Sequence, residues 1–257
     1  MTMWPYPKIV AHRGGGTLAP ENTFAALRCG LAYGFRAVEF DVMLSQDGIG
    51  VVIHDERLGR TVQGSGLVSD YRAAELAAMD AGSWFSPLFA DETVPDFGQF
   101  VDYCILQRIW MNIEIKPVPG FERATGRVVA AVAAAYFEAD IGAGAPAAGA
   151  PARLPLLSSF SVEALAAARD AAPGLPRALL IDSVPADWQA QASKLDVVSV
   201  HTNHLHLTPA LARAIKQAGF GLFCYTVNQP ERAREILGWG VDGLCTDRID
   251  LIGPAFA

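Results

Sequence analysis

Charged residues alternate with apolar ones in two β-rich segments of the chain. VEFDV carries Glu39 and Asp41, and NIEIKP carries Glu114 and Lys116. Successive strand residues point to opposite faces, so the two residues of each pair share one face of their strand. A charge in an apolar strand costs free energy unless it is paired or binds a metal. The spacing therefore predicts either an interior salt bridge between Glu114 and Lys116 or a site for a cation.

A cationic pair and three glycines follow another β-rich segment, near the N-terminus. In IVAHRGGGTLAPENTF, His12 and Arg13 come after the apolar run and directly before Gly14–Gly16. Glycines let backbone N–H groups approach an anion closely, an arginine can fork onto phosphate oxygens, and a histidine can move a proton. This stretch is either a turn that happens to be basic or a site for an anion.

Short β-rich runs recur along the chain and alternate with helical patterns. An additional run, Gly50–Ile53, follows the turn SQDG and indicates a hairpin partner of the second run. The other runs are Lys8–Ala11, Ala37–Leu44, Ile109–Lys116, Leu154–Phe160, Arg177–Ile181, Val197–Val200, Gly221–Val227 and Gly243–Thr246. Eight strands alternating with helices over 257 residues predict one (β/α)8 TIM barrel domain spanning residues 1–257. A doubly wound sheet is the alternative, although no Gly-x-Gly-x-x-Gly follows an early strand.

Several intervening helices have recognisable ends. Asn22 can cap a helix that Gly34 ends, and Asn228 can start another. Thr208-Pro209 is typical of a helix start, and Gly219 of the end of the same helix.

Two segments interrupt the alternation of strands and helices. Residues 55–94 form a long connection, which we expect to be a small cap inserted after the second strand, over the barrel mouth. It contains SDYRAAELAAM, which has a helical pattern, and the aromatic turn GSWFSPLF, whose Trp84, Phe85 and Phe89 either pack the cap or contact a substrate. The low-complexity segment Gly142–Ala152 predicts a mobile surface loop without an assigned function.

Composition excludes several classes of function. Apolar residues make up 51% of the 257 positions, enough to bury one large core. The net charge is −7, and no run of basic residues exceeds two, so we expect no nucleic-acid partner. No apolar run reaches the roughly 18 residues of a membrane span, and MTMWPYPK lacks the apolar stretch of a secretory signal. We expect a cytosolic protein. The cysteines lack metal-ligand spacing and are expected to be reduced core residues: Cys29, Cys104, Cys224 and Cys245.

Polar residues gather at the predicted strand ends. In (β/α)8 barrels the C-terminal ends of the strands meet at one mouth, where the chemistry takes place. Carboxylates brought together recruit a cation, and three oxygen-donor acids suit a hard divalent ion such as Mg²⁺ or Ca²⁺. With that ion bound, the mouth would attract a phosphate. The residues expected there are His12, Arg13, Glu39, Asp41, His54, Glu114 and Lys116.

Motifs along almost the whole chain resemble those of bacterial glycerophosphodiester phosphodiesterases, in particular the cytosolic enzymes associated with glycerol-3-phosphate uptake. The resemblance rests on HRGGGTLAPENT, EFDVMLSQDG, VVIHDERLGRT, NIEIKP, LLSSF, YTVN and GVDGLCTD. It implies a TIM barrel that depends on a divalent cation (Mg²⁺, Ca²⁺ or Mn²⁺) and hydrolyses glycerophosphodiesters to sn-glycerol 3-phosphate and an alcohol. It also implies that the glycerol 2-hydroxyl is an internal nucleophile that gives a cyclic intermediate.

The same resemblance implies a role for each polar residue at the mouth. Two histidines resemble a general acid–base pair, three carboxylates resemble metal ligands, and two cations resemble phosphate-binding groups. Glu21 also matches the family, although an acid in the first turn of a helix, where it favours the dipole, explains it equally well. The three sets are, in order, His12 and His54; Glu39, Asp41 and Glu114; and Arg13 and Lys116.

The motif HTNHLHLTP offers a rival interpretation. It contains His201, His204 and His206, and a His-x-His pair binds a transition metal in amidohydrolase barrels. There the pair closes the first strand, whereas the first strand of this chain ends in His12-Arg13. We expect His206 in a loop, while His201, at a predicted strand end, is a candidate for the mouth. A non-catalytic phosphate-binding barrel is a further alternative, but it would need no second histidine.

Overall fold

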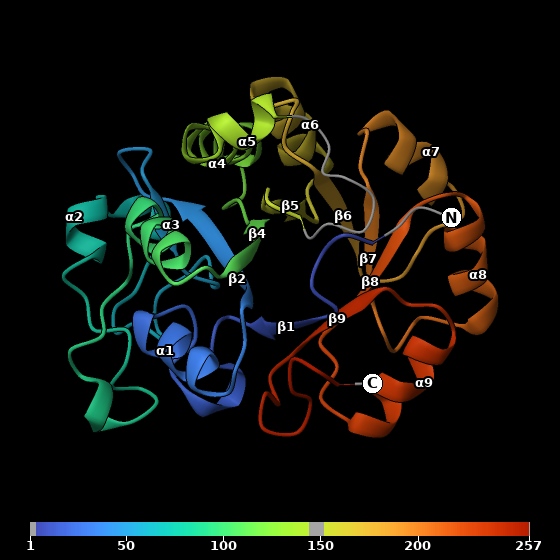
Figure 1. Cartoon of the computed structure of the whole chain (residues 1–257). Coiled ribbons are helices and arrows are strands. Elements are labelled where there is room, and N and C mark those ends of the chain that lie inside the picture. The colour runs from blue at the N-terminus through green and yellow to red at the C-terminus, as the bar shows by residue number, and fades with distance from the viewer. Residues whose placement is uncertain (1–3, 144–151, 257) are drawn as a thin grey trace.

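The computed structural model describes residues 4–143 and 152–256. Its strands are β1 (Ile9–His12), β2 (Ala37–Leu44), β3 (Gly50–Val52), β4 (Trp110–Ile115), β5 (Leu156–Ser159), β6 (Arg177–Ile181), β7 (Ser199–Asn203), β8 (Gly221–Tyr225) and β9 (Gly243–Thr246). They form one nine-stranded sheet in which β1 pairs with both β9 and β2, so the sheet closes on itself (Figure 1). β3 runs antiparallel to β2 at the rim, and the other eight strands are parallel. The predicted parallel barrel is confirmed.

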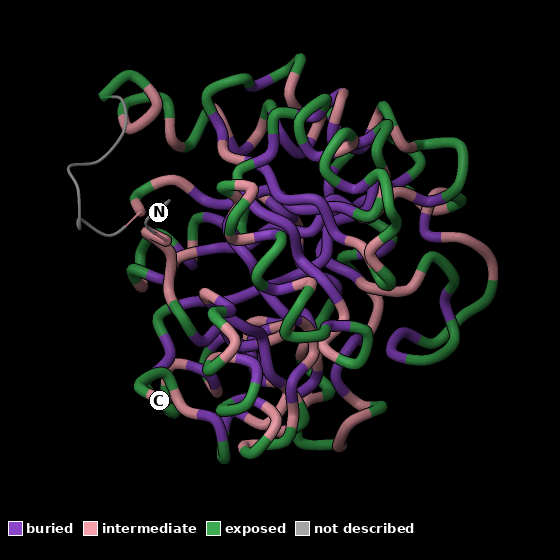
Figure 2. The backbone as a smooth tube through the Cα atoms, turned by 90° about the vertical axis from the view of Figure 1, so that its right-hand side faces the viewer, coloured by how far each residue is buried: buried purple, intermediate pink, exposed green. Residues whose placement is uncertain are grey.

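Helices form the outer layer around the strands (Figure 1). They are α1 (Phe24–Ala32), α2 (Ala73–Leu76), α3 (Phe97–Leu106), α4 (Glu122–Tyr136), α5 (Glu138–Gly142), α6 (Val162–Ala171), α7 (Trp188–Lys194), α8 (Pro209–Gln217) and α9 (Pro230–Gly238). Single 3₁₀ turns are η1 (Gly16–Leu18), η2 (Val68–Asp70) and η3 (Pro87–Phe89). Figure 2 shows the resulting pattern of burial, with buried segments concentrated in the centre and exposed segments on the outside.

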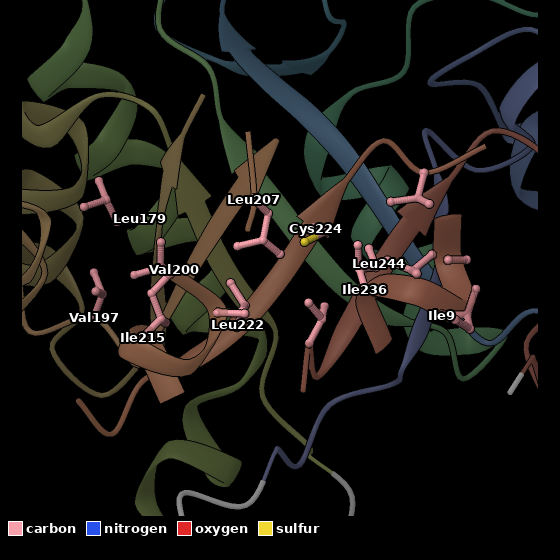
Figure 3. Packing of buried hydrophobic residues seen from close by; sticks show 14 of the residues in the cluster. Ile9, Leu179, Val197, Val200, Leu207, Ile215, Leu222, Cys224, Ile236 and Leu244 are labelled. Carbon is pink, nitrogen blue, oxygen red and sulfur yellow. The ribbon is translucent and has the colours of Figure 1, made fainter. Parts of the chain in front are cut away.

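An apolar layer joins the barrel strands to these helices. Figure 3 shows Val200 of β7 and Leu222 of β8 in one cluster with Ile215 of α8 and Ile236 of α9. All four side chains are fully buried. Burying a side chain of this size stabilises the folded state by about 1.5–3 kcal/mol, so this layer fixes the strands. The side chains on the inner faces of the strands are thereby held in place.

Several predicted boundaries agree with the structure. The runs Ala37–Leu44, Arg177–Ile181 and Gly243–Thr246 are strands with the predicted ends. Thr208 caps α8 by accepting a backbone N–H in the first turn, and Gly219, with φ +88°, follows the end of that helix. These ends depend on local chemistry, which explains why the sequence predicts them well.

Two predicted capping residues are wrong by one position, although both helices start where the sequence predicts, and in each case a tertiary contact uses the polar side chain. Thr23, rather than Asn22, caps α1. The side chain of Asn22 instead donates to Asp41, at 2.9 Å. Asn228 lies one residue before the cap position of α9, and its side chain binds Asp247 at 2.9 Å. Both asparagines therefore belong to the interior of the barrel mouth and not to the helices that follow them.

The helix predicted for SDYRAAELAAM is also largely wrong. Only Ala73–Leu76, in α2, is α-helical, and Val68–Asp70 forms a single 3₁₀ turn. Tyr71 and Arg72 between them have extended backbones. The carbonyl of Tyr71 accepts the backbone N–H of Gln46 at 2.7 Å, which ties this segment to the β2–β3 turn and prevents the helix from starting earlier.

Other predictions concern the loops and cysteines. Of the low-complexity segment Gly142–Ala152, all but Gly142, Ala143 and Ala152 lie outside the described residues, so the loop prediction stays untested there. All four cysteines of the sequence are described and unpaired, and all but Cys29 are buried. Within the ranges described, no helix combines the length and hydropathy required to cross a bilayer.

Candidate active site

Three buried carboxylates meet on two adjacent strands. Glu39 and Asp41 lie on β2 and Glu114 on β4, and the register sets Asp41 directly opposite Glu114. One carboxylate oxygen from each residue lies within 4.8 Å of the others. Strand alternation explains the convergence, since residues 39 and 41 share the inner face of β2. Three converging oxygen donors without a thiolate are the ligand set of a hard divalent cation, so the residues fit such an ion.

Two cations lie against this acidic cluster. Arg13 Nε is 3.4 Å from Asp41 Oδ2, and Lys116 Nζ is 3.5 Å from Asp41 Oδ1. Lys116 Nζ also donates to Glu114 Oε1 at 3.2 Å, so the interior salt bridge that the spacing predicts is present. This salt bridge is compatible with a cation site, because the single positive charge of Lys116 is shared between two of the three acids.

The pKa values of the three carboxyl groups respond to burial first and to the neighbouring charges second. Burial and the charges of Asp41 and Glu114 raise the pKa of Glu39 well above its usual value. Burial and the charge of Asp41 raise the pKa of Glu114 to about 7. Burial opposes the ionisation of Asp41, but the charges of Arg13 and Lys116 still hold its pKa below the usual value. A bound divalent cation would add positive charge to the cluster.

Each of the two predicted catalytic histidines is held by an aspartate. His12 Nδ1 lies 2.5 Å from Asp247 Oδ1, and His54 Nδ1 lies 2.6 Å from Asp55 Oδ1. In both rings the aspartate contacts Nδ1 and not Nε2, and Nε2 of His12 lies 3.7 Å from Glu39 Oε2. Burial lowers the pKa of His54, although the charge of Asp41 opposes that shift. His54 is therefore neutral near pH 7 and able to accept a proton.

The sequence motifs contained these two aspartates, but their role was not predicted. Asp55 follows His54 directly in VVIHDERLGRT, and Asp247 ends GVDGLCTD. A carboxylate adjacent to a candidate catalytic histidine is a usable signal for Asp55. For Asp247 the sequence holds no local signal, because its partner lies 235 positions away. Only closure of the barrel between β1 and β9 brings the two residues together.

The glycine triplet serves close packing at this closure. Gly14 and Gly16 have φ +93° and +55°. A Cβ on Gly16 would lie 2.1 Å from the carbonyl oxygen of Asp247, and one on Gly14 would lie 2.8 Å from Cβ of Ala26. Arg13 also has a left-handed backbone, with φ +51°, a conformation that costs energy in a non-glycine residue. The tight turn is therefore what aims Arg13 back into the barrel and seats His12 beside Asp247.

A network of arginines and acids surrounds Arg13. Arg13 Nη1 donates to Glu21 Oε1 at 2.7 Å, and Arg60 Nη1 donates to Glu21 Oε2 at 2.8 Å. Arg60 Nε also binds Asp55 Oδ2 at 2.5 Å. Glu21 precedes the first turn of α1, which begins at residue 24, so the helix dipole does not explain it. Instead, Glu21 links the phosphate-binding candidate Arg13 to the Asp55–His54 pair through Arg60.

A cavity of about 180 Å³, called here the inner cavity, lies among these residues. Asp41 lies beside it through its contacts to Arg13 and Lys116. The structure thus brings together all seven residues that the sequence predicts at the mouth. All of them except Asp41 line the inner cavity: His12, Arg13, Glu39, His54, Glu114 and Lys116.

The histidines of the rival motif have separate partners. His201 is buried and lines the inner cavity, where its Nε2 lies 3.1 Å from Ser199 Oγ. His204 Nδ1 accepts from Arg232 at 3.3 Å, and the loop residue His206 lies 3.4 Å from Asp182. In the described part of the chain, the group able to hold a metal is the carboxylate cluster and includes none of them.

Comparisons with known proteins agree on one family. The model of the glycerophosphoryl diester phosphodiesterase family matches residues 12–251. A glycerophosphodiester phosphodiesterase from Caldanaerobacter subterraneus is 31% identical over 243 residues, which cover 93% of each chain.

Solved structures match the same length of chain. A phosphodiesterase from Oleispira antarctica, in complex with the product sn-glycerol-3-phosphate, has a TM-score of 0.83 at 33% identity and covers 94% of this chain and 93% of its own. A glycerophosphodiester phosphodiesterase from Agrobacterium tumefaciens has a TM-score of 0.76 at 29% identity, with 95% of this chain and 98% of its own covered.

Proposed function

We infer the roles of individual residues from one premise: the chain belongs to the glycerophosphoryl diester phosphodiesterase family. It is a glycerophosphodiester phosphodiesterase, from a family that depends on a metal ion, and it acts on small-molecule glycerophosphodiesters. The observation that carries our assignment of roles is the meeting of three buried carboxylates, two cations and two aspartate-held histidines around the inner cavity. We propose that this cavity is where the diester is cleaved.

In this proposal Glu39, Asp41 and Glu114 hold one divalent cation, with Mg²⁺ or Ca²⁺ preferred because all three ligands are carboxylates. When bound, the ion supplies positive charge that polarises a phosphoryl oxygen and offsets the acidic cluster. Arg13 and Lys116 hold the phosphate. Both cations are fixed by acids on one side, which leaves their remaining N–H groups for phosphoryl oxygens.

His54 and His12 then act as base and acid. His54 Nε2 takes the proton of the glycerol 2-hydroxyl, and that oxygen attacks phosphorus. The bond from phosphorus to the alcohol oxygen breaks, and His12 Nε2 donates its proton to the departing alcohol. The products of this step are the free alcohol and a cyclic phosphodiester of glycerol, which water opens to glycerol phosphate with the two histidines in reversed roles. The lowered pKa of His54, caused chiefly by burial, supports its role as the first base.

The proposal also covers the setting of the enzyme. We propose a single barrel domain over residues 1–257 in which residues 55–94 cap the mouth, a cytosolic location and the type associated with glycerol-3-phosphate uptake. The four unpaired cysteines support the location, because a reducing compartment keeps thiols free. Fractionation of cells that produce the protein tests it, and recovery outside the cytosol would contradict it.

The direct test of function is release of sn-glycerol 3-phosphate from a panel of diesters, with choline, ethanolamine, glycerol or inositol as the alcohol. Each assay is run with Mg²⁺, Mn²⁺ or Ca²⁺ and again with chelator. We expect release only in the presence of metal. Absence of glycerol 3-phosphate from every diester with every metal would overturn the proposal.

A further inference from the structure

A second cavity adjoins the inner one and shares two residues with it. This outer cavity, of about 370 Å³, is lined by His12, Arg13, Glu21, Trp84, Phe85 and Asp247, together with part of η1. Glu39, Glu114, His54 and Lys116 line the inner cavity and do not line the outer one. His12 and Arg13 therefore stand at the junction between two compartments of different chemistry.

That junction divides a phosphodiester into two arms. A phosphate held by Arg13 at the junction would have one of these two cavities on either side for its two substituents. The inner cavity, of about 180 Å³, carries the polar groups that a small polyol such as glycerol needs. The outer cavity is about twice as large and more open, which suits an alcohol of variable structure. It also adjoins His12, the histidine to which the proposed mechanism gives the proton for the leaving alcohol.

The aromatic turn provides a rigid wall for this outer cavity. Trp84 is 42% exposed, and its Nε1 donates to the carbonyl of Ala81 at 2.9 Å, so the orientation of the ring is fixed. Phe85 meets Trp84 edge-on, with ring centroids 5.7 Å apart, and Phe89 supports Phe85 at 5.6 Å. An exposed, immobilised indole is the aromatic group that binds an organic cation best.

The charges of the outer cavity favour the same ligand. Two carboxylates, Glu21 and Asp247, face it. Among the described lining residues Arg13 is the one permanent cation, and its Nη1 already donates to Glu21 at 2.7 Å. A second anionic group on the alcohol would meet two acids there, whereas an ammonium group would meet acids and an aromatic face.

We propose that the outer cavity receives the alcohol half of the diester and that Trp84 selects alcohols that carry an organic ammonium group. This inference rests on the proposed function, because it needs the phosphate at Arg13. Trp84, an exposed residue of the 55–94 segment, would thus determine which alcohol is accepted, a role separate from maintaining the fold.

The test compares two substrates in two matched variants. Trp84→Leu keeps an apolar side chain but removes the π face, and Trp84→Phe keeps an aromatic ring. Leu88→Ala is the control, since Leu88 lies in the same turn, is 92% exposed and does not line the cavity. For each protein kcat/KM is measured with glycerophosphocholine and with glycerophosphoglycerol, whose alcohol is uncharged, at one saturating metal concentration.

We expect Trp84→Leu to lower kcat/KM for glycerophosphocholine by about 3-fold to 30-fold, the range of a cation–π contact, and to change glycerophosphoglycerol less than 2-fold. Trp84→Phe should retain most of the preference, and Leu88→Ala all of it. Tetramethylammonium should inhibit the wild-type enzyme competitively and the Trp84→Leu variant more weakly.

An equal fall for both substrates, or no fall for either, would overturn the inference while the wild-type enzyme still cleaved both. Failure of the wild-type enzyme to cleave any diester would instead contradict the proposed function. If the Trp84→Leu variant did not fold, the tetramethylammonium measurement on the wild-type and Trp84→Phe proteins would decide, and absence of competitive inhibition of both would overturn the inference.

Discussion

Asp247 and His12 come from opposite ends of the chain, and Oδ1 of the carboxylate lies 2.5 Å from Nδ1 of the imidazole. Asn228 fixes the carboxylate, because its Nδ2 donates to Oδ2 at 2.9 Å and its Oδ1 accepts the backbone N–H of Asp247 at 2.8 Å. The series of contacts sets the plane of the His12 ring and places Nε2 on the side of the carboxylate cluster, 3.7 Å from Glu39 Oε2. Asp247 is thus a positioning residue for the proposed general acid.

Asp247→Asn should therefore lower kcat by about 10- to 100-fold, less than the roughly 10²- to 10⁴-fold loss expected for His12→Ala. The double variant should be no slower than His12→Ala, since the two residues act as one unit. Asp250→Asn, which affects only an exposed pair with Arg248, is the control. Multiplicative losses in the double variant would show that Asp247 acts independently of His12.

Metal binding should depend on each carboxylate of the cluster. Glu39→Gln, Asp41→Asn and Glu114→Gln should each weaken Mg²⁺ binding by at least about 10-fold and reduce turnover in proportion, because each removes one charged oxygen donor. Titration calorimetry measures the affinity, and circular dichroism checks that the barrel persists. Unchanged affinity in all three variants would refute the assignment of this site.

A second metal-binding experiment tests Asn22, which contacts one of the three carboxylates. Its side chain donates to Asp41 at 2.9 Å and does not belong to the carboxylate cluster. Asn22→Ala should weaken Mg²⁺ binding by about 10- to 100-fold, the usual effect of losing a group that orients a ligand. An affinity equal to that of the wild-type protein would mean that Arg13 and Lys116 alone orient Asp41.

Cleavage should require the hydroxyl next to the phosphate. The 2-deoxy analogue of glycerophosphocholine should bind but scarcely react, because the internal nucleophile is missing, and simple dialkyl phosphates should behave alike. The measurement is the single-turnover rate of each compound at saturating metal. Similar rates for glycerophosphocholine and its 2-deoxy analogue would make water the nucleophile and would leave the site residues unaffected.

His201 should make the folded protein sensitive to acid. Burial lowers its pKa to about 3, against a usual value of about 6.5. Between these pH values the unfolded chain takes up a proton that the folded chain refuses, so stability falls as pH falls. Between pH 7 and pH 4.5 this one group should cost about 2–3 kcal/mol of unfolding free energy. His201→Gln should flatten the pH dependence by that amount in urea titrations.

Much of the fold could be read from local patterns. β-rich runs at regular spacing gave the order of the strands, and Thr208-Pro209 and Gly219 marked the ends of α8 because capping depends on adjacent residues. The helix predicted around Tyr71 failed because the carbonyl of Tyr71 is bound by the β2–β3 turn, a contact that no local pattern contains. Local signals succeed where local hydrogen bonds decide the structure.

The candidate site likewise has one part that local patterns predict and one part that they do not. Alternation along β2 and β4 is a local property, so the sequence by itself determined that Glu39, Asp41 and Glu114 face one interior. Their grouping within 4.8 Å needed β2 and β4 to pair in register, whereas the pairing of His12 with Asp247 required the barrel to close. Closure brings the first and last strands side by side through pairing of residues more than 200 positions apart, and this places Asp247 against the His12 ring. The sequence thus predicted which residues could carry out the chemistry. Only the tertiary structure showed which residues contact and position them.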